Sequence, residues 1–304
     1  MTKTVFFAVF LGSIAVAVQA QQLDTTSQWP AIVATEDRIY PNIVYSKAGG
    51  YEVKLDVITA GPDFKPRPTL VFFHGGGWVG GSKDASTLGA LPYLSRGMNV
   101  VNVEYRLASV ALAPAAVEDC RCALRWVYQY SGQYGFDTAR LVVAGGSAGG
   151  HLALMSGMLD PGAGFDNIGC GWWPPGHHEL KVAAIVNIYG ITDVADVLEG
   201  PHRQDWAVAW FGSLSNRMEL AKRLSPLTYV RAGLPPVLTI HGDLDTDVPY
   251  QEGVRLHEAL DRFGVANQFV TITGGKHGFW TREQNLRAQQ SIFNFLEKYG
   301  IITR

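Results

Sequence analysis

The feature that most constrains the fold of this chain is the regular alternation of short apolar runs with longer helical stretches. Most of the apolar runs are bounded by glycine, proline or a polar cluster, as buried parallel strands are. The helical stretches carry apolar residues at three- and four-residue spacing. This alternation predicts βαβ units, and therefore an α/β fold with one mostly parallel sheet covered by helices on both faces. The expected strands are 51–57, 70–73, 100–103, 141–144, 182–188, 237–240 and 268–272, and the expected helices are 115–130, 148–159, 250–263 and 285–299.

The strand expected over 51–57 differs from the others because its apolar and polar residues alternate. A period of two predicts one buried and one exposed face. We therefore expect this strand to be half-exposed.

Composition excludes two classes of protein. Hydrophobic residues are 47% of the chain and charged residues 17%, so the chain is not disordered through high charge. Lys and Arg number 25 against 27 acidic residues, and no basic block occurs, so we expect no nucleic-acid partner. No linker or repeat interrupts the pattern, which predicts a single domain over 21–304 with two long excursions, at 160–179 and 190–234.

The second excursion, 190–234, lies between two predicted strands and is far longer than the usual connection of about 2–6 residues. Trp206, Trp210 and Phe211 within it either line a pocket or pack the excursion against the body of the protein. Packing is the favoured interpretation.

The N-terminal segment has the pattern of a secretory signal peptide. A basic start is followed by an apolar run and by small residues that end at Ala20. The run is shorter than the roughly 20 apolar residues that span a membrane, which disfavours an uncleaved anchor. We expect cleavage after Ala20, a secreted or periplasmic location and no membrane association of the mature protein.

The chain has three cysteines, an odd number, and export would permit a disulfide. Cys120 and Cys122 lie two residues apart on a predicted helix and therefore point in different directions. At most one of them can pair with Cys170. Three buried thiols are the alternative.

A serine follows the predicted strand 141–144 in the pattern Gly-x-Ser-x-Gly, and a helical stretch begins at once. This strand–turn–helix context is what a nucleophile elbow requires. The turn is cramped, and Gly145 and Gly149 lack the Cβ atoms that would clash there. The N-terminus of the next helix directs free N–H groups toward developing negative charge. Ser147 is therefore the candidate nucleophile.

Three glycines follow the predicted strand 70–73 in the sequence His-Gly-Gly-Gly-Trp. Glycines leave their N–H groups unshielded, and ligands bind at the carboxyl ends of strands in open α/β sheets. We therefore expect an oxyanion hole rather than a plain turn. Its expected donors are the N–H groups of Gly76, Gly77 and Ala148.

The candidate base is His277, which lies between the predicted strand 268–272 and the last predicted helix. Glycines flank it, so the loop can carry the imidazole to the edge of the sheet. A serine, an aspartate and a histidine in this chain order match the order found in α/β-hydrolases.

Three aspartates compete for the role of the acid: Asp243, Asp245 and Asp247. Asp243 is nearest the strand end. Asp247 lies next to Val248-Pro249, where the next helix is expected to begin and where a carboxylate often caps free N–H groups. Asp245 is in the middle of the loop and is best able to reach His277, so we predict Asp245.

The sequence resembles an α/β-hydrolase of the carboxylesterase kind, in the hormone-sensitive-lipase-like group with its HGGG signature. It is most similar to bacterial hydrolases of the feruloyl- and acetyl-xylan-esterase type. The resemblance covers about 51–304 and also favours Asp245, because in similar hydrolases the acid precedes x-x-Val-Pro. The matching segments are HGGGWVGGSKD (74–84), EYRL (104–107), LVVAGGSAGGHLALM (141–155), HGDLDTDVP (241–249) and GGKHGF (274–279).

The resemblance implies a serine esterase that uses no cofactor. Ser147 attacks an ester carbonyl, His277 takes and returns the proton, and Asp245 orients the imidazole. The expected substrate is a small-molecule or polysaccharide-linked ester. We expect short acyl chains, because no long apolar lid helix of the lipase type is recognisable. The alternatives are a serine peptidase or arylformamidase acting on amides, and a non-catalytic binding module, which generally lacks a triad member.

Other polar residues have structural interpretations. His74 is expected to order the glycine loop by hydrogen bonding, and His151 to be a satisfied core residue. Arg106, Asp119 and Arg125 are expected to be structural ion-pair partners rather than catalytic residues. The residues that could suggest a metal site, 177–179 and His202, have no spacing typical of one, and we expect no metal.

Overall fold

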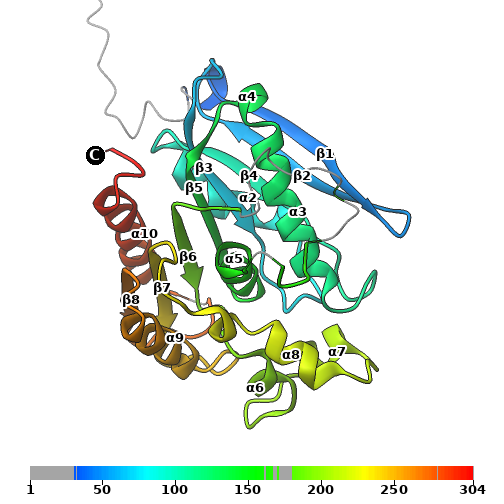
Figure 1. Ribbon diagram of the computed structural model, residues 1–304. Coiled ribbons are helices and arrows are strands. Elements are labelled where there is room, and N and C mark those ends of the chain that lie inside the picture. Colours follow the sequence, from blue (N-terminus) through cyan, green and yellow to red (C-terminus); the bar gives the residue numbers. More distant parts are fainter. Residues whose placement is uncertain are drawn as a thin grey trace, which may run out of the picture.

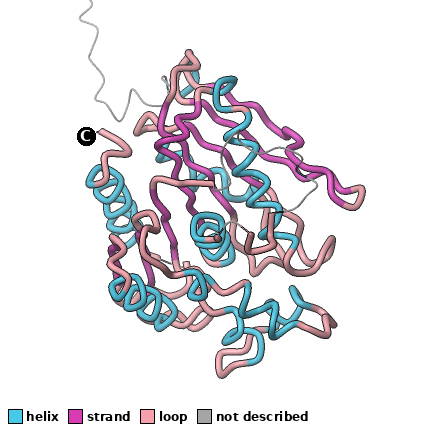
Figure 2. Tube along the Cα trace, in the orientation of Figure 1, coloured by secondary structure: helices cyan, strands magenta, loops and turns pink. Residues whose placement is uncertain are grey.

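The computed structural model describes residues 31–303 except 32, 161, 167–169, 171–179 and 279 (Figure 1). Within these residues, the strands form one sheet in the order β1-β2-β4-β3-β5-β6-β7-β8, and helices pack on both faces (Figure 2). The strands are β1 (Arg38–Ala48), β2 (Tyr51–Thr59), β3 (Arg67–Phe73), β4 (Asn99–Val103), β5 (Phe136–Gly146), β6 (Ala184–Ile188), β7 (Val237–Gly242) and β8 (Asn267–Ile272). The helices are α2 (Lys83–Leu94), α3 (Ala115–Gln129), α4 (Ser131–Tyr134), α5 (Ala148–Met158), α6 (Val194–Glu199), α7 (Asp205–Phe211), α8 (Arg217–Arg223), α9 (Tyr250–Arg262) and α10 (Arg282–Lys298).

The sheet is mostly parallel, as the sequence predicted. From β4 through β3 to β8 every neighbouring pair is parallel, whereas β2 is antiparallel to both β1 and β4. The prediction missed β1, α2, the short helix α4 and the three helices within the second excursion, α6, α7 and α8. Proline, polar residues and two register shifts interrupt the pattern of β1, and Gly89 and Pro92 interrupt that of α2.

Two apolar layers enclose the sheet. The layer on one face includes side chains of α3, α5 and α9, and the layer on the other includes side chains of α2 and α10. The central strands are buried between these layers, and β4 and β7 are buried along their whole length. Because all the parallel strands end at one edge, the loops that follow β3, β5, β6, β7 and β8 meet there.

The expected half-exposure of strand 51–57 is wrong for most of its length. Only its first residues are exposed, and Asp56 is buried. The Nζ of Lys83, on α2, lies 2.9 Å from the Asp56 carboxylate. The polar face of β2 is therefore covered by a helix that supplies the opposite charge.

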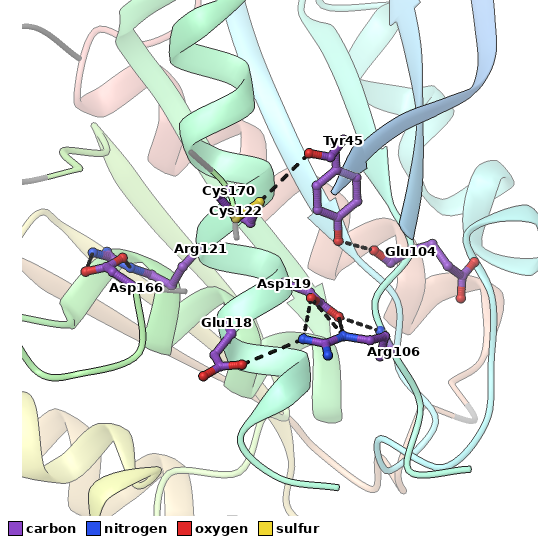
Figure 3. Close-up of a disulfide and its surroundings, with 9 residues drawn as sticks. All are labelled: Tyr45, Glu104, Arg106, Glu118, Asp119, Arg121, Cys122, Asp166 and Cys170. Atoms are coloured by element: carbon purple, nitrogen blue, oxygen red, sulfur yellow. Dashed lines mark hydrogen bonds and ion pairs between the residues drawn. A yellow bond between two sulfur atoms is a disulfide. The ribbon is translucent and has the colours of Figure 1, made fainter. Parts of the chain in front are cut away.

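A disulfide joins Cys122, on α3, to Cys170, in the first excursion (Figure 3). The two Cα atoms are 5.7 Å apart, and Cys120 is a buried free thiol. Arg121 points toward Asp166 of the same excursion, with its Nε 2.9 Å from the carboxylate (Figure 3). A covalent bond and an ion pair thus tie this segment to α3, whereas most of 167–179 lies outside the described residues.

The second excursion, 190–234, carries α6, α7 and α8, which lie together beyond the end of the parallel strands (Figure 1). Trp210 and Phe211 are buried, and Trp210 stacks on Trp78 with ring centroids 4.0 Å apart. For these two side chains the packing interpretation is confirmed.

The expected signal peptide, 1–20, lies outside the described residues. Among the residues that are described, no helix is both long and apolar enough to cross a membrane.

Candidate active site

The predicted site residues gather at the carboxyl edge of the sheet. From β3 the chain crosses to β4 on one side and later enters β5 on the other side of β3. Such a reversal of strand order opens a crevice at the strand ends, where ligands bind in α/β sheets. Phe73 of β3 is aligned with Gly145 of β5, so the loops that follow these two strands border the same crevice.

Ser147 stands at a sharp turn between β5 and α5. Its backbone has φ +56° and ψ −123°, a conformation that side-chain-bearing residues rarely adopt. A Cβ at Gly149 would lie 2.1 Å from the Phe73 carbonyl oxygen, and one at Gly145 would lie 2.5 Å from it. The two glycines therefore let the turn pack against the end of β3 and hold the serine hydroxyl at the crevice.

Ser147, His277 and Asp245 form a continuous hydrogen-bonded chain. The Ser147 hydroxyl lies 2.8 Å from Nε2 of His277, and Nδ1 of His277 lies 2.8 Å from the Asp245 carboxylate. Asp245 is fully buried at its side chain, whereas the His277 side chain is 17% exposed. With Nδ1 protonated and donating to Asp245, Nε2 is free to accept the serine proton.

The Asp245 carboxylate is held by further donors. The N–H groups of Asp247 and Val248 each donate to its Oδ1 at 2.9 Å, and Nε2 of His241 is 3.3 Å from Oδ2. Burial opposes ionisation of this carboxyl, but the hydrogen bonds from His241, His277 and Val248 outweigh it and hold the pKa of Asp245 well below its usual range. Asp245 therefore stays charged beside the imidazole.

The other two aspartates have different surroundings. Asp243 is exposed and accepts a hydrogen bond from the N–H of Gly274 at 2.7 Å, which joins the two loops. The expected capping role of Asp247 is wrong. Helix α9 begins at Tyr250 after Pro249, and no side chain caps its N-terminus.

The glycine loop after β3 lies against the serine turn. A Cβ at Gly75 would come within 2.9 Å of the Gly146 carbonyl oxygen. Gly76 and Gly77 have φ values of +116° and +59°, which glycine adopts readily, and both line the cavity beside Ser147. Ala148 is the first residue of α5, where an N–H group has no acceptor within its own helix.

Ser147 and His277 line a cavity of about 650 Å³. Trp206 also lines it, so one of the three aromatic residues of the second excursion does border a pocket. The sequence analysis missed Tyr189 and Trp280. The ring centroid of Tyr189 lies 4.7 Å from that of His277 and 5.3 Å from that of Trp280. The signal available for Tyr189 was its position directly after a predicted strand.

The residues expected to be structural are so placed. Nδ1 of His74 lies 2.8 Å from the Gly75 carbonyl oxygen, within the glycine loop. His151 is buried, its Nε2 is 2.7 Å from the Leu224 carbonyl oxygen, and burial lowers its pKa to about 4. Its buried Nδ1 has no hydrogen-bond partner among the described residues, so the expectation of a satisfied core residue holds for only one of its two nitrogens. Residues 177–179 lie outside the described residues. Elsewhere in the described chain, no group of three or more His, Cys, Asp or Glu side chains could hold a metal.

A protein-family model described as BD-FAE matches residues 55–260, more than half of the chain. The chain belongs to the BD-FAE family. This match covers the serine turn and the aspartate loop, whereas His277 lies beyond its end.

Curated relatives of this BD-FAE protein carry esterase names. Esterase LipC of Mycobacterium tuberculosis is 30% identical over 226 residues, which cover 71% of this chain and 54% of LipC. Carboxylesterase NlhH of the same species is 28% identical over 222 residues, covering 70% of this chain and 66% of NlhH. The chain thus spans between half and two thirds of the length of these relatives.

Solved esterase structures share the fold over nearly the whole domain. Esterase 2 of the Planctomycetes species Thermogutta terrifontis, with propionate bound, has a TM-score of 0.71 and 28% identity, and the match covers 89% of this chain and 97% of that one. The same esterase phosphonylated by sarin has a TM-score of 0.74 and 26% identity, covering 91% and 99%. The fold is therefore that of the α/β-hydrolase esterases.

Proposed function

We propose that the protein is an exported serine esterase that hydrolyses short-chain or carbohydrate-linked carboxylic esters through an acyl-enzyme. The observation that carries this proposal is the hydrogen-bonded chain from Asp245 through His277 to Ser147, which ends in a hydroxyl on the wall of a cavity. Membership of the BD-FAE family and the esterase names of its relatives support the same reaction class.

In the first half of the proposed reaction, Oγ of Ser147 forms a bond to the ester carbonyl carbon while Nε2 of His277 takes the hydroxyl proton. The carbonyl oxygen becomes an oxyanion, for which the N–H groups of Gly76, Gly77 and Ala148 are the proposed donors. Asp245 holds the imidazole in the required tautomer and stabilises its cation.

The carbon–oxygen bond to the alcohol then breaks, and the departing oxygen takes the proton from Nε2 of His277. Water adds to the acyl-enzyme by the same steps, giving up a proton to His277 and releasing the carboxylic acid and the free Ser147 hydroxyl. Each half-reaction returns the imidazole to its starting tautomer, so the triad needs no external acid or base.

A preference for short acyl groups is supported by Thermogutta terrifontis esterase 2, which has been solved with propionate and with butyrate bound. The test is a panel of p-nitrophenyl esters from acetate to laurate, assayed beside acetylated xylan and methyl ferulate. We expect acetate or butyrate esters to be hydrolysed fastest. Faster hydrolysis of laurate esters would contradict the acyl preference, and inactivity on both plant-derived substrates would remove the carbohydrate-linked part of the proposal.

The esterase proposal itself is tested with a fluorophosphonate probe, since Thermogutta terrifontis esterase 2 is phosphonylated by an organophosphorus compound of this kind. We expect labelling of Ser147 in the native protein and none after heat denaturation. A binding module without a reactive serine would not label.

Export is supported by the signal-peptide pattern alone. Its test is N-terminal sequencing of the protein recovered outside the cytoplasm of an expressing bacterium. We expect the mature chain to begin at Gln21, and an intact Met1 on protein found only in the cytoplasm would contradict export.

A further inference from the structure

One part of the cavity lies between α2 and α10, beside the serine turn. The residues of these helices that line it recur at three- and four-residue spacing, so each helix contributes one face. They are Ser86, Gly89 and Tyr93 on α2, and Asn285, Ala288, Gln289 and Ile292 on α10. We call this part the side chamber.

The floor of the side chamber is the sheet itself. Phe72 lies in the central strand β3, where Val71 and Phe73 are wholly buried, yet the Phe72 side chain is only partly buried and lines the cavity. Ile188, the last residue of β6, is likewise partly buried and lines the cavity. A central sheet surface that no helix covers completely is available to an apolar group of a ligand.

The far end of the side chamber is closed because α2 and α10 touch there. The rings of Tyr93 and Phe293 meet edge to face with their centroids 5.8 Å apart. Beyond them, Nη2 of Arg96 lies 3.4 Å from the Glu297 carboxylate. Tyr93 and its partner therefore bound the side chamber where the two helices meet.

Neither the backbone nor the packing explains the glycine at position 89. It lies inside α2, where glycine is less favourable than alanine, and its φ is not positive. An added Cβ would meet the Cζ of Phe72 at 3.9 Å, an ordinary van der Waals contact. By contrast, Cβ atoms at Gly145 and Gly149 would clash with backbone at 2.5 and 2.1 Å. A side chain at Gly89 would instead occupy the space next to Phe72.

We propose that the side chamber binds an apolar group of the ester substrate and that Gly89 sets the size of the group that fits. The proposal rests on the proposed esterase function. Phe72, Ile188, Ala288 and Ile292 present hydrocarbon, which favours a compact branched or cyclic group of limited length. Because the chamber adjoins Ser147, this group can belong to the acyl part or to the alcohol part of the ester.

The test compares Gly89→Leu with the wild type in two arms. The acyl arm is the ratio of kcat/KM for p-nitrophenyl isovalerate to that for p-nitrophenyl acetate, and the alcohol arm is the ratio for cyclohexyl acetate to ethyl acetate. We expect Gly89→Leu to lower one of these ratios by about tenfold or more. In a hydrophobic pocket, a difference of one methylene group between two substrates already changes the ratio of their kcat/KM values by about this factor. The arm that changes identifies which part of the ester occupies the chamber.

Two further variants guard the interpretation. Gly132→Leu, on α4, adds the same side chain where a Cβ meets nothing within 4 Å, away from the cavity, and both ratios should stay at the wild-type values. Gly89→Ala should lower the same ratio as Gly89→Leu by a smaller factor without lowering Tm, because alanine favours the helix.

If a folded Gly89→Leu protein still labels at Ser147 and both of its ratios equal those of the wild type, the side-chamber proposal is overturned and the esterase proposal stays intact. Failure of the wild type to hydrolyse any of the four esters or to label at Ser147 would overturn the esterase proposal, and the side-chamber proposal with it.

Discussion

Two buried hydrogen-bonded networks in this protein, each built on an aspartate, differ in where they end. In one, Asp119 on α3 accepts hydrogen bonds from Nε and the backbone N–H of Arg106 at 2.8 and 2.9 Å (Figure 3). In the other, the Asp245 carboxylate accepts from His277, which in turn meets the hydroxyl of Ser147. Both carboxylates are shielded from water. Among the residues that the structure describes, only the second network has members that line the cavity.

Burial and pairing do not by themselves mark a catalytic group. Arg106 keeps its charge at any accessible pH, so its pair with Asp119 can only hold two segments together. An imidazole has two nitrogens, so one can keep its proton in a hydrogen bond to the carboxylate while the other takes and returns the proton of a hydroxyl. On this account, losing the first network should affect stability, and losing the second should affect turnover.

The largest expected effect is that of Ser147→Ala, which removes the reactive end of the second network. We expect kcat on p-nitrophenyl acetate to fall by about 10⁶-fold, as in serine hydrolases that lose the nucleophile. Removing a single oxygen atom at the cavity wall should leave Tm close to the wild-type value. Near-wild-type turnover by a protein of verified mass would show that Ser147 is not the nucleophile.

The next effect separates the three aspartates of the loop after β7. Asp245→Asn keeps the side-chain shape but favours the wrong imidazole tautomer, and we expect kcat to fall by up to about 10⁴-fold. Asp243→Asn and Asp247→Asn serve as matched controls, and each should lower kcat far less than Asp245→Asn does. An inactive Asp243 or Asp247 variant beside an active Asp245 variant would reverse the assignment.

Breaking the first network should give the opposite pattern. Asp119→Ala leaves the buried guanidinium of Arg106 without its main partner, and we expect the free energy of unfolding to fall by about 3–5 kcal/mol in urea titrations. The kcat of the fraction that remains folded should be close to that of the wild type. The exposed pair Arg203–Asp205 is the control, and Asp205→Ala should cost about 1 kcal/mol or less. A large loss of kcat in folded Asp119→Ala would erase the distinction between the networks.

The smallest expected effect concerns acid stability. The pKa of Asp245 is lowered in the folded protein, so its ionised form contributes stability that is present above the unfolded pKa of about 3.9 and lost as the pH falls toward the folded pKa. The stability difference between wild type and Asp245→Asn should therefore shrink below about pH 4, by at most about 1.4 kcal/mol per pH unit. Urea titrations at pH 5 and pH 3 measure it, and a difference that grows at pH 3 would have the wrong sign.

Much of the fold could be predicted because its signals are local. The apolar runs that became β3 to β8 and the periodic stretch that became α3 carry their pattern in consecutive residues. The error at β2 has a long-range cause, because Asp56 is polar in sequence but is buried against Lys83 of α2. Helix α2 itself, interrupted by Gly89 and Pro92, shows no clear apolar periodicity.

The candidate site was predictable where chemistry demands particular residues in a strand-end context, as at Ser147 and His277. The choice of Asp245 among three aspartates depended partly on family resemblance, and its hydrogen bond to His277 agrees with that choice, although its role stays a prediction. Tyr189 follows a predicted strand, but its contact with His277 and that of Trp280 with Tyr189 form only on folding, so the sequence did not assign either ring to the site.

In the proposed mechanism, Ser147 forms a covalent acyl-enzyme. To detect this acyl-enzyme directly, a stoichiometric excess of p-nitrophenyl acetate is mixed with the Asp245→Asn variant, in which turnover is slowed. The mixture is quenched in acid, and its peptides are mapped by mass spectrometry. We expect an added acetyl group on the Ser147 hydroxyl, which disappears on longer incubation and is absent from Ser147→Ala. An acyl-enzyme at Ser147 would be contradicted if the wild type hydrolysed the ester while no acetyl group was found at Ser147 at any time. An acetyl group on another residue that forms and disappears along with turnover would contradict it as well.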